Sequence, residues 1–359
     1  MSNYSKELII DDFIINDSSQ TYFIADIAAN HDSDLSRAKE LIHMCAEAGA
    51  NAAKFQHFSA DTIVSDFGFK SLGKQISHQS SWNKSVYQIY KDASLNLEWT
   101  EILAAECKKA GITFFTSPYS IEIIEIVDKF IPAYKIGSGD ITWHEIVLHI
   151  AKKNKPYFIA AGASNMNEVI DIVDKCSEVN NKLCLMQCNT NYTASLENFK
   201  YINLNVLNTF KKTFPGLILG LSDHTPGHST VLGAISLGAK LIEKHFTDDN
   251  KREGPDHKFS MNPASWRDMV DRARELELAL GDGIKRIENN ELETTILQRR
   301  SIRAKRNIKK GENITENDIV YLRPCTNQGI PPYKYDKIVN HKVKDDIKAG
   351  EEITWQMIK

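Results

Sequence analysis

The fold is decided by a repeating unit whose first copy is YFIADIAANHDSDLSRAKELIHMCAEAGA, residues 22–50. The copy begins with the apolar run YFIADIA and passes through polar turn residues. It then enters LSRAKELIHMCAEAG, whose apolar side chains fall on one helical stripe: Leu35, Ala38, Leu41, Ile42 and Cys45. Gly49 follows as a stop signal. A buried strand followed by an amphipathic helix is therefore expected here.

The same unit recurs until about residue 280. Strands are expected at 22–28, 52–58, 112–118, 133–139, 157–162, 183–189, 217–224 and 240–247. Helices are expected at 34–48, 98–110, 120–129, 143–153, 165–179, 200–213, 228–237 and 264–279. Eight units in about 260 residues are typical of an α/β fold of the (β/α)8 or TIM-barrel type. A doubly wound open sheet is the alternative, but its first turn is usually glycine-rich, and ADIAANHDSD contains no GxGxxG.

One connection is too long to be a plain loop. Residues 59–96 separate the second expected strand from its helix and contain SSWNKSVYQIYK, which is expected to form a short helix. Long insertions in barrels usually shape the active site.

The pattern changes after residue 282. We assign residues 1–282 to the barrel, 283–300 to a polar linker and 301–359 to a small β-rich domain. That domain contains a near-repeat, NIKKGENIT at 307–315 and DIKAGEEIT at 346–354. Each copy is expected to form a strand, a Lys-x-Gly turn and a second strand.

The overall composition argues against several classes of protein. A net charge of −3 over 359 residues does not favour a nucleic-acid-binding surface along the whole chain. No apolar run approaches the roughly 20 residues that span a membrane. The N-terminus has no secretory signal, and the six cysteines lack zinc or redox spacing. A cytoplasmic protein with reduced thiols is expected.

Polar residues gather at the ends of the expected strands. In a barrel, side chains alternate between the interior and the helix layer, and the active site forms at the C-terminal ends of the strands. The polar residues at these ends are Asp26, Lys54, Gln56, Lys135, Ser138, Ser222, His224, Glu243 and His245. On the same alternation Lys244 faces the helices, where no partner is evident.

Two histidines stand on neighbouring expected strands. His224 and His245, with acids nearby, suit a divalent metal. Buried histidines in ordinary hydrogen bonds are the alternative.

Two lysines point at the same mouth. Lys54 and Lys135 favour an anionic substrate, while a Schiff base or a structural pair with a carboxylate are the alternatives. The segments GSGD (137–140) and AAGASN (160–165) lie where strands give way to helices, and the exposed backbone N–H groups there suit phosphate. Together these features suggest a phosphate-bearing substrate.

In this order, these residues resemble the sialic acid synthase family, whose members condense phosphoenolpyruvate with an amino sugar. The resemblance covers nearly the whole chain. Its motifs are ANHDSDLSRAKELI, AAKFQ, YKIGSGD, LSDHTPGH, EKHFTDD and GPDHKFSM, followed by a C-terminal module like the SAF (antifreeze-like, β-clip) domain. The resemblance implies a TIM barrel with that domain and a domain-swapped homodimer, in which the SAF domain of one chain covers the barrel mouth of the other.

The resemblance also implies roles for individual residues. His224 and His245 would bind a divalent metal, Mn²⁺ or Mg²⁺, beside Glu243. The phosphoenolpyruvate-binding positions would be Lys54, Ser117, Lys135, Ser138, Thr190 and Ser222. The sugar-binding positions would be Asp26, Gln56, Tyr192, Asp256 and, from the SAF domain, Arg323. The catalytic residues would be Asp26, Glu243, Lys54 and Lys135.

The implied reaction is a metal-dependent condensation of phosphoenolpyruvate with an open-chain N-acetylated amino hexose. The products would be a nine-carbon 2-keto-3-deoxy sugar acid and phosphate, released by C–O cleavage. Asp26 or Glu243 would orient the attacking water. A Schiff-base aldolase acting on a pyruvate-type substrate and a non-catalytic sugar-binding barrel remain alternatives.

Three positions depart from the family pattern. Asp26 stands where the family usually has Glu, Ala160 replaces a phosphate-binding Ser, and Thr190 replaces an Asn. Ser164 or backbone groups are candidates to compensate for the missing hydroxyl of Ala160. The departures leave open whether the sugar is N-acetylmannosamine or a 2,4-diacetamido-dideoxyhexose precursor of legionaminate or pseudaminate.

Overall fold

The structure, a computed structural model, describes residues 4–75, 79–80 and 82–358. The chain forms two compact units, Met1–Gly281 and Asp282–Lys359, and each is described by itself. In the described ranges no helix combines the length and the apolar character needed to cross a bilayer.

The first unit is built on eight parallel strands. They are β3 (Tyr22–Asp26), β4 (Ala52–His57), β5 (Thr113–Pro118), β6 (Tyr134–Ile136), β7 (Tyr157–Ala160), β8 (Leu183–Cys188), β9 (Ile218–Asp223) and β10 (Leu241–His245). The hydrogen-bonded order is β5-β4-β3-β10-β9-β8-β7-β6, and β5 and β6, at its two ends, pack side by side. This arrangement confirms the predicted barrel.

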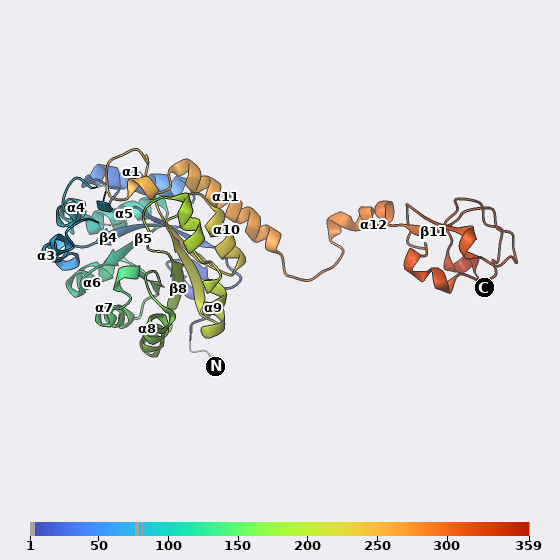
Figure 1. The fold of residues 1–359 in the computed structure, drawn as a ribbon, viewed down its shortest axis with the longest axis horizontal. Helices are drawn as coiled ribbons and strands as arrows, with labels where there is room; N and C mark the ends of the chain where they lie inside the picture. Colours follow the sequence, from blue (N-terminus) through green and yellow to red (C-terminus); the bar gives the residue numbers. More distant parts are fainter. Residues whose placement is uncertain (1–3, 76–78, 81, 359) are drawn as a thin grey trace. The chain divides into compact units, whose positions relative to one another are not determined.

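Each strand is followed by a helix, and the helices surround the sheet (Figure 1). They are α1 (Leu35–Glu47), α5 (Trp99–Ala110), α6 (Ile121–Val127), α7 (His144–Ala151), α8 (Met166–Val179), α9 (Val206–Thr213), α10 (Ser229–Ser236) and α11 (Pro263–Leu280). Side-chain caps fix several starts: the Asp34 carboxylate accepts from Ser36 N and Arg37 N before α1. The apolar stripe of α1, including Leu41 and Ile42, packs into the core between helices and sheet.

The barrel interior is apolar towards the N-terminal ends of the strands. Alternate strand side chains point inward there, among them Tyr22, Phe115 and Phe158. A hairpin of β1 (Leu8–Ile10) and β2 (Phe13–Ile15) adds its own apolar side chains to this cluster. The sequence did not predict this hairpin. Because these apolar side chains fill that part of the interior, the polar strand residues lie at the C-terminal ends of the strands.

Among its described residues, the insertion between β4 and α5 forms the short helices α2 (Ala60–Ile63), α3 (Asp66–Ser71) and α4 (Val86–Ala93). The single helix expected within SSWNKSVYQIYK corresponds to α4, while Ser81 of that stretch lies outside the described residues. The helices α2 and α3 were not anticipated.

The second unit is a small β-rich body. It contains α12 (Leu292–Gln298), within the segment predicted as linker, and the antiparallel strands β11 (Ser301–Ala304) and β12 (Ile319–Leu322). Its own buried cluster is dominated by isoleucine, for example Ile302 and Ile314.

The near-repeat in this unit forms its turns where expected. Glu312 N donates to Lys309 O at 2.9 Å and Glu351 N donates to Lys348 O at 3.0 Å. Gly311 takes the positive φ of 83° that such a turn requires.

The two strands expected in each copy, which lie wholly within the described ranges, do not pair with each other across the turn. Instead the two copies pair with each other, since Ile308 and Ile347 exchange two backbone hydrogen bonds of 2.8 and 2.9 Å. Burying both isoleucines against one core favours this pairing between copies over a solvated local hairpin.

Candidate active site

Two lysines and two carboxylates meet inside the barrel at the ends of four strands. Lys54 Nζ donates to Asp26 Oδ2 at 2.6 Å and lies 3.9 Å from Glu243 Oε1. Lys135 Nζ is 3.2 Å from the same Glu243 oxygen. All four residues are at most 5% exposed, so the charges are balanced within the barrel rather than by solvent.

The charge on Lys54 is retained despite burial. Desolvation lowers the pKa of its ammonium, but the nearby carboxylates of Asp26 and Glu243 outweigh desolvation, and the net pKa is raised. A lysine in this state attracts anions and is a poor amine nucleophile.

The two predicted metal histidines face each other. The ring centroids of His224 and His245 lie 5.4 Å apart. His224 Nδ1 pairs with the carbonyl oxygen of Asn189 at 3.0 Å, so this nitrogen carries the hydrogen and Nε2 keeps its lone pair. Burial, together with mutual repulsion, lowers the pKa of His224 to about 3, and burial beside Lys54 does the same for His245. Both rings are therefore neutral, as metal ligands must be.

Two buried polar atoms at this place find no hydrogen-bond partner among the described residues. They are Nδ1 of His245 and Oε2 of Glu243. Orphaned atoms of this kind commonly belong to a site that a bound ion or substrate completes. The donor set therefore fits a divalent ion.

That donor set is small. Within the described ranges, no group of three or more His, Cys, Asp or Glu side chains could hold a metal. A divalent ion here would take two imidazoles from the protein and further ligands from water or substrate.

The predicted serines and Gln56 surround the charged groups. Lys54 Nζ donates to Ser117 Oγ at 3.4 Å, and Ser222 Oγ donates to Glu243 Oε1 at 3.2 Å. Gln56 Nε2 donates to Asp26 Oδ2 at 3.0 Å. Asp26 is thereby held by two donors from β4.

Two adjoining cavities contain these residues. The inner one, of about 40 Å³, is lined by Asp26, Lys54, Gln56, Ser117, Tyr119, Lys135, Gly137, Ser138, Ala160, Cys188, Tyr192, Ser222, His224, Glu243 and His245. The outer one, of about 400 Å³, shares several of these residues and adds Thr190 and Asp256. Apart from Arg323, the residues predicted for the site therefore all line one or both of these adjoining cavities.

Two carboxyl groups that line the outer cavity are weaker acids than usual. Burial raises the pKa of Asp256 to about 7, and its Oδ2 accepts from Ala29 N at 3.2 Å. Burial likewise raises the pKa of Asp140 to about 6. Carboxyls that are partly protonated near neutral pH can both donate to and accept from sugar hydroxyls.

The insertion forms part of the outer cavity wall. Ile63 from α2 and Ile89, Tyr90 and Ala93 from α4 line it, together with Trp82. The expectation that a long barrel insertion shapes the site is met by this geometry.

Thr190 and Ala160, two of the positions that depart from the family pattern, both lie in the site. Thr190 Oγ1 and Ser138 Oγ share a hydrogen bond of 2.7 Å, and Gly162 leaves room for Thr190, because a Cβ there would lie 2.0 Å from Oγ1. Ala160 lines the inner cavity with a methyl group. Ser164 does not replace its hydroxyl, since Ser164 Oγ donates to Gly162 O at 3.1 Å and lines neither cavity.

Some site residues were missed by the sequence reasoning. Tyr119 and Asp140 each follow a predicted residue by two positions, so the same alternation, extended past the strand end, could have found them. Cys188 was not among the predicted site residues, and it also lines the inner cavity. Tyr90 could not have been found, because its place depends on the path of the insertion. Arg323 lies after β12 in the second unit and is exposed.

Lys244 has a structural partner. On the outer side of the sheet its Nζ donates to Asp223 Oδ2 and to Thr225 O, both at 2.5 Å. Asp223 is also held by the hydroxyls of Thr225 and Thr230, at 2.8 and 2.7 Å. Because Asp223 and Lys244 precede the two histidines in sequence, this network fixes the strand ends that carry His224 and His245.

Comparisons with known proteins show which family the chain belongs to. The model of the NeuB family matches residues 41–285, and that of the SAF domain matches 299–359. The chain is 35% identical over 349 residues to an N,N′-diacetyllegionaminic acid synthase of Legionella pneumophila, covering 95% of this chain and 96% of the relative. It is 32% identical over 341 residues to a pseudaminic acid synthase of Campylobacter jejuni, covering 94% and 96%.

A solved structure supports the fold. The N-acetylneuraminic acid synthetase of Leptospira borgpetersenii matches with a TM-score of 0.70 at 24% identity, over 81% of this chain and 95% of that one. The resemblance seen in the sequence is thus confirmed: the chain belongs to the NeuB family, with the sialic, legionaminic and pseudaminic acid synthases, and carries a C-terminal SAF domain.

Proposed function

We propose that this chain condenses phosphoenolpyruvate with the open-chain form of an N-acetylated amino hexose, giving a nonulosonic acid and phosphate. The observation that carries the proposal is the juxtaposition of Lys54 and Lys135 with two neutral, buried histidines. Cationic lysines suit a carboxylate-phosphate substrate, and neutral imidazoles suit a divalent cation.

Phosphoenolpyruvate would lie in the inner cavity. Its charges would be neutralised by Lys54 and Lys135, which are now shared with Asp26 and Glu243. The surrounding hydroxyls are further donors for phosphate oxygens: Ser117, Ser138, Thr190 and Ser222. A volume of about 40 Å³ is small for this ligand, so side chains at the mouth would move on binding.

The reaction forms a C–C bond between the two substrates and a C–O bond from water, and it breaks the C–O bond to phosphate. The methylene carbon of phosphoenolpyruvate attacks the aldehyde carbon, whose oxygen takes up a proton and becomes a hydroxyl. Water adds to the carbon that bears the phosphate, and that C–O bond then breaks to leave a ketone and inorganic phosphate. Asp26 or Glu243, which both line the inner cavity, would orient this water and accept its proton. A divalent cation on His224 and His245 would supply Lewis acidity to the aldehyde.

The sugar would occupy the outer cavity. Gln56, Tyr192 and Asp256 line it and offer an amide, a phenol and a carboxyl group to hydroxyls. We further propose a domain-swapped homodimer, in which Arg323 of a second copy reaches the N-acyl group. The legionaminic and pseudaminic acid synthases among the relatives favour a 2,4-diacetamido hexose over N-acetylmannosamine.

A Schiff-base aldolase is the second candidate. It would need a neutral lysine, whereas the pKa of Lys54 is raised. The raised pKa therefore favours anion binding at Lys54 over Schiff-base formation there.

The experiment uses the full chain after EDTA treatment. Phosphoenolpyruvate and either hexose are supplied with and without Mn²⁺, and phosphate release is followed. We expect release only with sugar and metal, faster with the 2,4-diacetamido hexose, and lost in His245→Ala. Metal-independent release would refute the roles of His224 and His245, and borohydride trapping of pyruvate on a lysine would establish the aldolase.

A further inference from the structure

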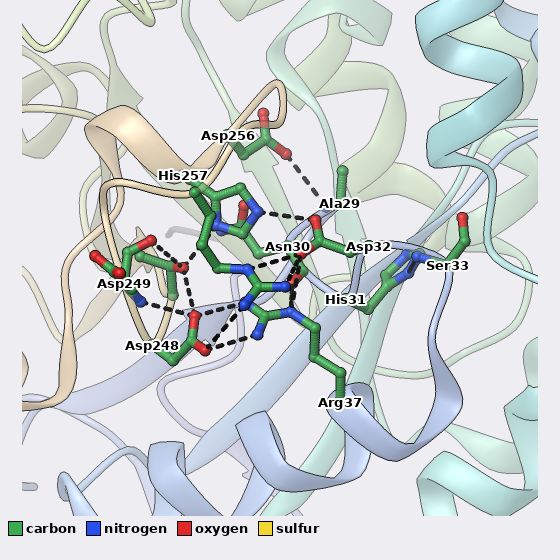
Figure 2. A network of polar contacts seen from close by, with 12 residues as sticks. Ala29, Asn30, His31, Asp32, Ser33, Arg37, Asp248, Asp249, Asp256 and His257 are labelled. Atoms are coloured by element: carbon green, nitrogen blue, oxygen red, sulfur yellow. Dashed lines mark hydrogen bonds and ion pairs between the residues drawn. The ribbon is translucent and has the colours of Figure 1, made fainter.

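A charged cluster joins the segment that leads from β3 into α1 to the connection between β10 and α11. It consists of Asp32, Arg37, Asp248, Arg252 and His257, and we refer to it as the clasp (Figure 2). Asp32 lies in the connection between β3 and α1, Arg37 lies in the first turn of α1, and the other three lie in the connection between β10 and α11. None of the five lines either cavity.

The clasp begins with a forked ion pair. Arg37 donates from its two terminal nitrogens to Asp248, at 2.6 Å to Oδ2 and 2.5 Å to Oδ1. Its Nε donates to the carbonyl oxygen of Asn30 at 2.8 Å. The Arg37 side chain is 9% exposed, so this bidentate pair is more strongly held than a surface salt bridge.

Asp32 is the acceptor that three cationic or N–H groups share. Arg252 Nε donates to Oδ2 at 3.0 Å and Arg252 Nη2 lies 2.9 Å from the same oxygen. Arg37 Nε lies 3.1 Å from this oxygen as well. His257 Nε2 lies 2.9 Å from Oδ1, and its other ring nitrogen pairs with Thr247 Oγ1 at 2.7 Å. The His257 ring is fully buried, so removal of the Asp32 charge leaves a buried donor with a weaker partner.

The loop that the clasp holds has an unusual backbone. Ala28, Asp32 and Ser33 have positive φ values of 46°, 51° and 57°, a region that non-glycine residues rarely adopt. Such conformations persist only where surrounding contacts fix them. The clasp supplies such contacts at Asp32, and the backbone N–H of Ser33 donates to His31 Nδ1 at 3.0 Å.

This loop in turn holds two carboxylates of the site. Ala28 N donates to Asp26 Oδ1 at 3.1 Å, and Ala29 N donates to Asp256 Oδ2 at 3.2 Å. Asp256 directly precedes His257 in the clasp. The clasp therefore fixes both the Asp256 carboxyl group and the Ala29 N–H group from which that carboxyl accepts a hydrogen bond.

A glycine allows the second loop to close over the clasp. A Cβ at Gly254 would lie 2.6 Å from His257 Cδ2 and 3.7 Å from Asp32 Oδ1. Any side chain at residue 254 would push against the His257–Asp32 contact. Gly254 therefore permits the close approach of the loop that carries Asp256.

We propose that Asp32 and Arg37, through the clasp, are positioning residues that hold Asp256 and the turn at Ala28 and Ala29 in the geometry that receives the sugar. The clasp contributes no atom to the reaction and acts through Asp256 and Asp26. This inference rests on the proposed function for its consequence in catalysis, but the ordering of the two loops is a property of the free chain.

The test uses Asp32→Asn and Arg37→Gln in the full chain. Arg272→Gln is the matched control, since Arg272 forms exposed ion pairs on α11 away from both cavities. Hydrogen–deuterium exchange of the free proteins is read at residues 28–33 and 254–261. We expect exchange there to rise about tenfold or more in the two clasp variants, with exchange in α8 unchanged.

Steady-state kinetics supply the second readout. In the clasp variants we expect the KM for sugar to rise about tenfold or more while the KM for phosphoenolpyruvate stays within about twofold. Loss of folded enzyme alone would lower kcat and leave both KM values unchanged. Arg272→Gln should match the wild type in both readouts.

The outcomes separate the two proposals. Wild-type exchange in Asp32→Asn, or equal effects on both KM values, overturns the positioning role. If the wild-type chain turns over no pair of substrates, the proposed function fails, and the exchange data alone decide whether the clasp orders the loops.

Discussion

Lys54 Nζ and Asp26 Oδ2 lie 2.6 Å apart across the adjacent strands β4 and β3, and both residues line the inner cavity. Both side chains are almost completely buried. The ion pair therefore joins a residue proposed to bind phosphoenolpyruvate to one proposed to activate water. In the free chain Asp26 pairs with the Lys54 ammonium, and an anionic substrate would pair with this same ammonium on binding.

Replacing Lys54 tests this relationship. In Lys54→Met, Asp26 and Glu243 lose a shared cation, and we expect the free energy of unfolding to fall by about 3–5 kcal/mol. Phosphate release should drop by about 10²–10³-fold, because a charge that stabilises the transition state is lost. Urea unfolding and initial rates measure the two effects, and wild-type stability in this variant would show that the pair is not formed.

Lys244→Met tests the network behind the histidines. The nearby ammonium offsets the desolvation of Asp223, whose pKa is lowered in the folded chain. Removing it should destabilise the fold by about 3–5 kcal/mol, measured by urea unfolding at neutral pH. The double variant Lys244→Met, Asp223→Asn should recover part of this loss, since no buried charge then remains.

The sign of the pH effect follows from the direction of that shift. A lowered folded pKa stabilises above the unfolded pKa, and the stabilisation is lost as pH falls through the folded value. The stability difference between wild type and Lys244→Met should therefore narrow in acid. A difference that stays constant would contradict the coupling of Asp223 to Lys244.

Asp256 gives the opposite pH dependence. Burial raises its pKa from 3.8 to about 7, so in that window the folded chain binds a proton that the unfolded chain has released. Asp256 contributes its whole stabilisation of the folded chain at pH values below the unfolded pKa. This stabilisation is lost as the pH rises towards about 7. Asp256→Asn lacks this loss, so its stability relative to wild type should increase between about pH 4 and about 8. A pH-independent difference in thermal or urea unfolding would refute the raised pKa.

Gly162→Ala tests the contact at the family departure Thr190. A Cβ at residue 162 would lie 2.0 Å from Thr190 Oγ1 and 3.0 Å from Cys188 Sγ. We expect a loss of about 1–3 kcal/mol in stability from overpacking, together with a higher KM for phosphoenolpyruvate. Adding Thr190→Ala removes the atom nearest to the new Cβ and should restore part of the lost stability and part of the change in KM. If Gly162→Ala alone has no effect, residues 162 and 190 are farther apart than the structure shows.

The strands of the barrel could be predicted because each joins a short apolar run to turn residues and a helical stripe. The hairpin of Leu8–Ile10 and Phe13–Ile15 escaped prediction because its strands have three residues each, too short for a period to show. The pairing of Ile308 with Ile347 was missed for another reason. It is a long-range contact, and local turn signals do not specify it.

The candidate site shows the same limit. Glu243 and His245 could be placed on one inward face because alternation fixes the direction of side chains on a strand. The wall made by α4 and the partners of Lys244 could not be predicted, because both depend on how loops and outer faces pack. The clasp between Asp32 and His257 joins residues 225 positions apart, a separation that no motif spans.

The central claim is condensation with cleavage of the C–O bond of phosphoenolpyruvate, and isotopic labelling tests it most directly. The full chain, supplied with Mn²⁺ and a 2,4-diacetamido hexose, is given phosphoenolpyruvate carrying ¹⁸O in the bridging position, and the phosphate is examined by mass spectrometry. The account predicts that the label leaves with phosphate and that a nine-carbon 2-keto acid forms in equal amount. Label retained in the organic product, or phosphate formed without the sugar, would contradict it.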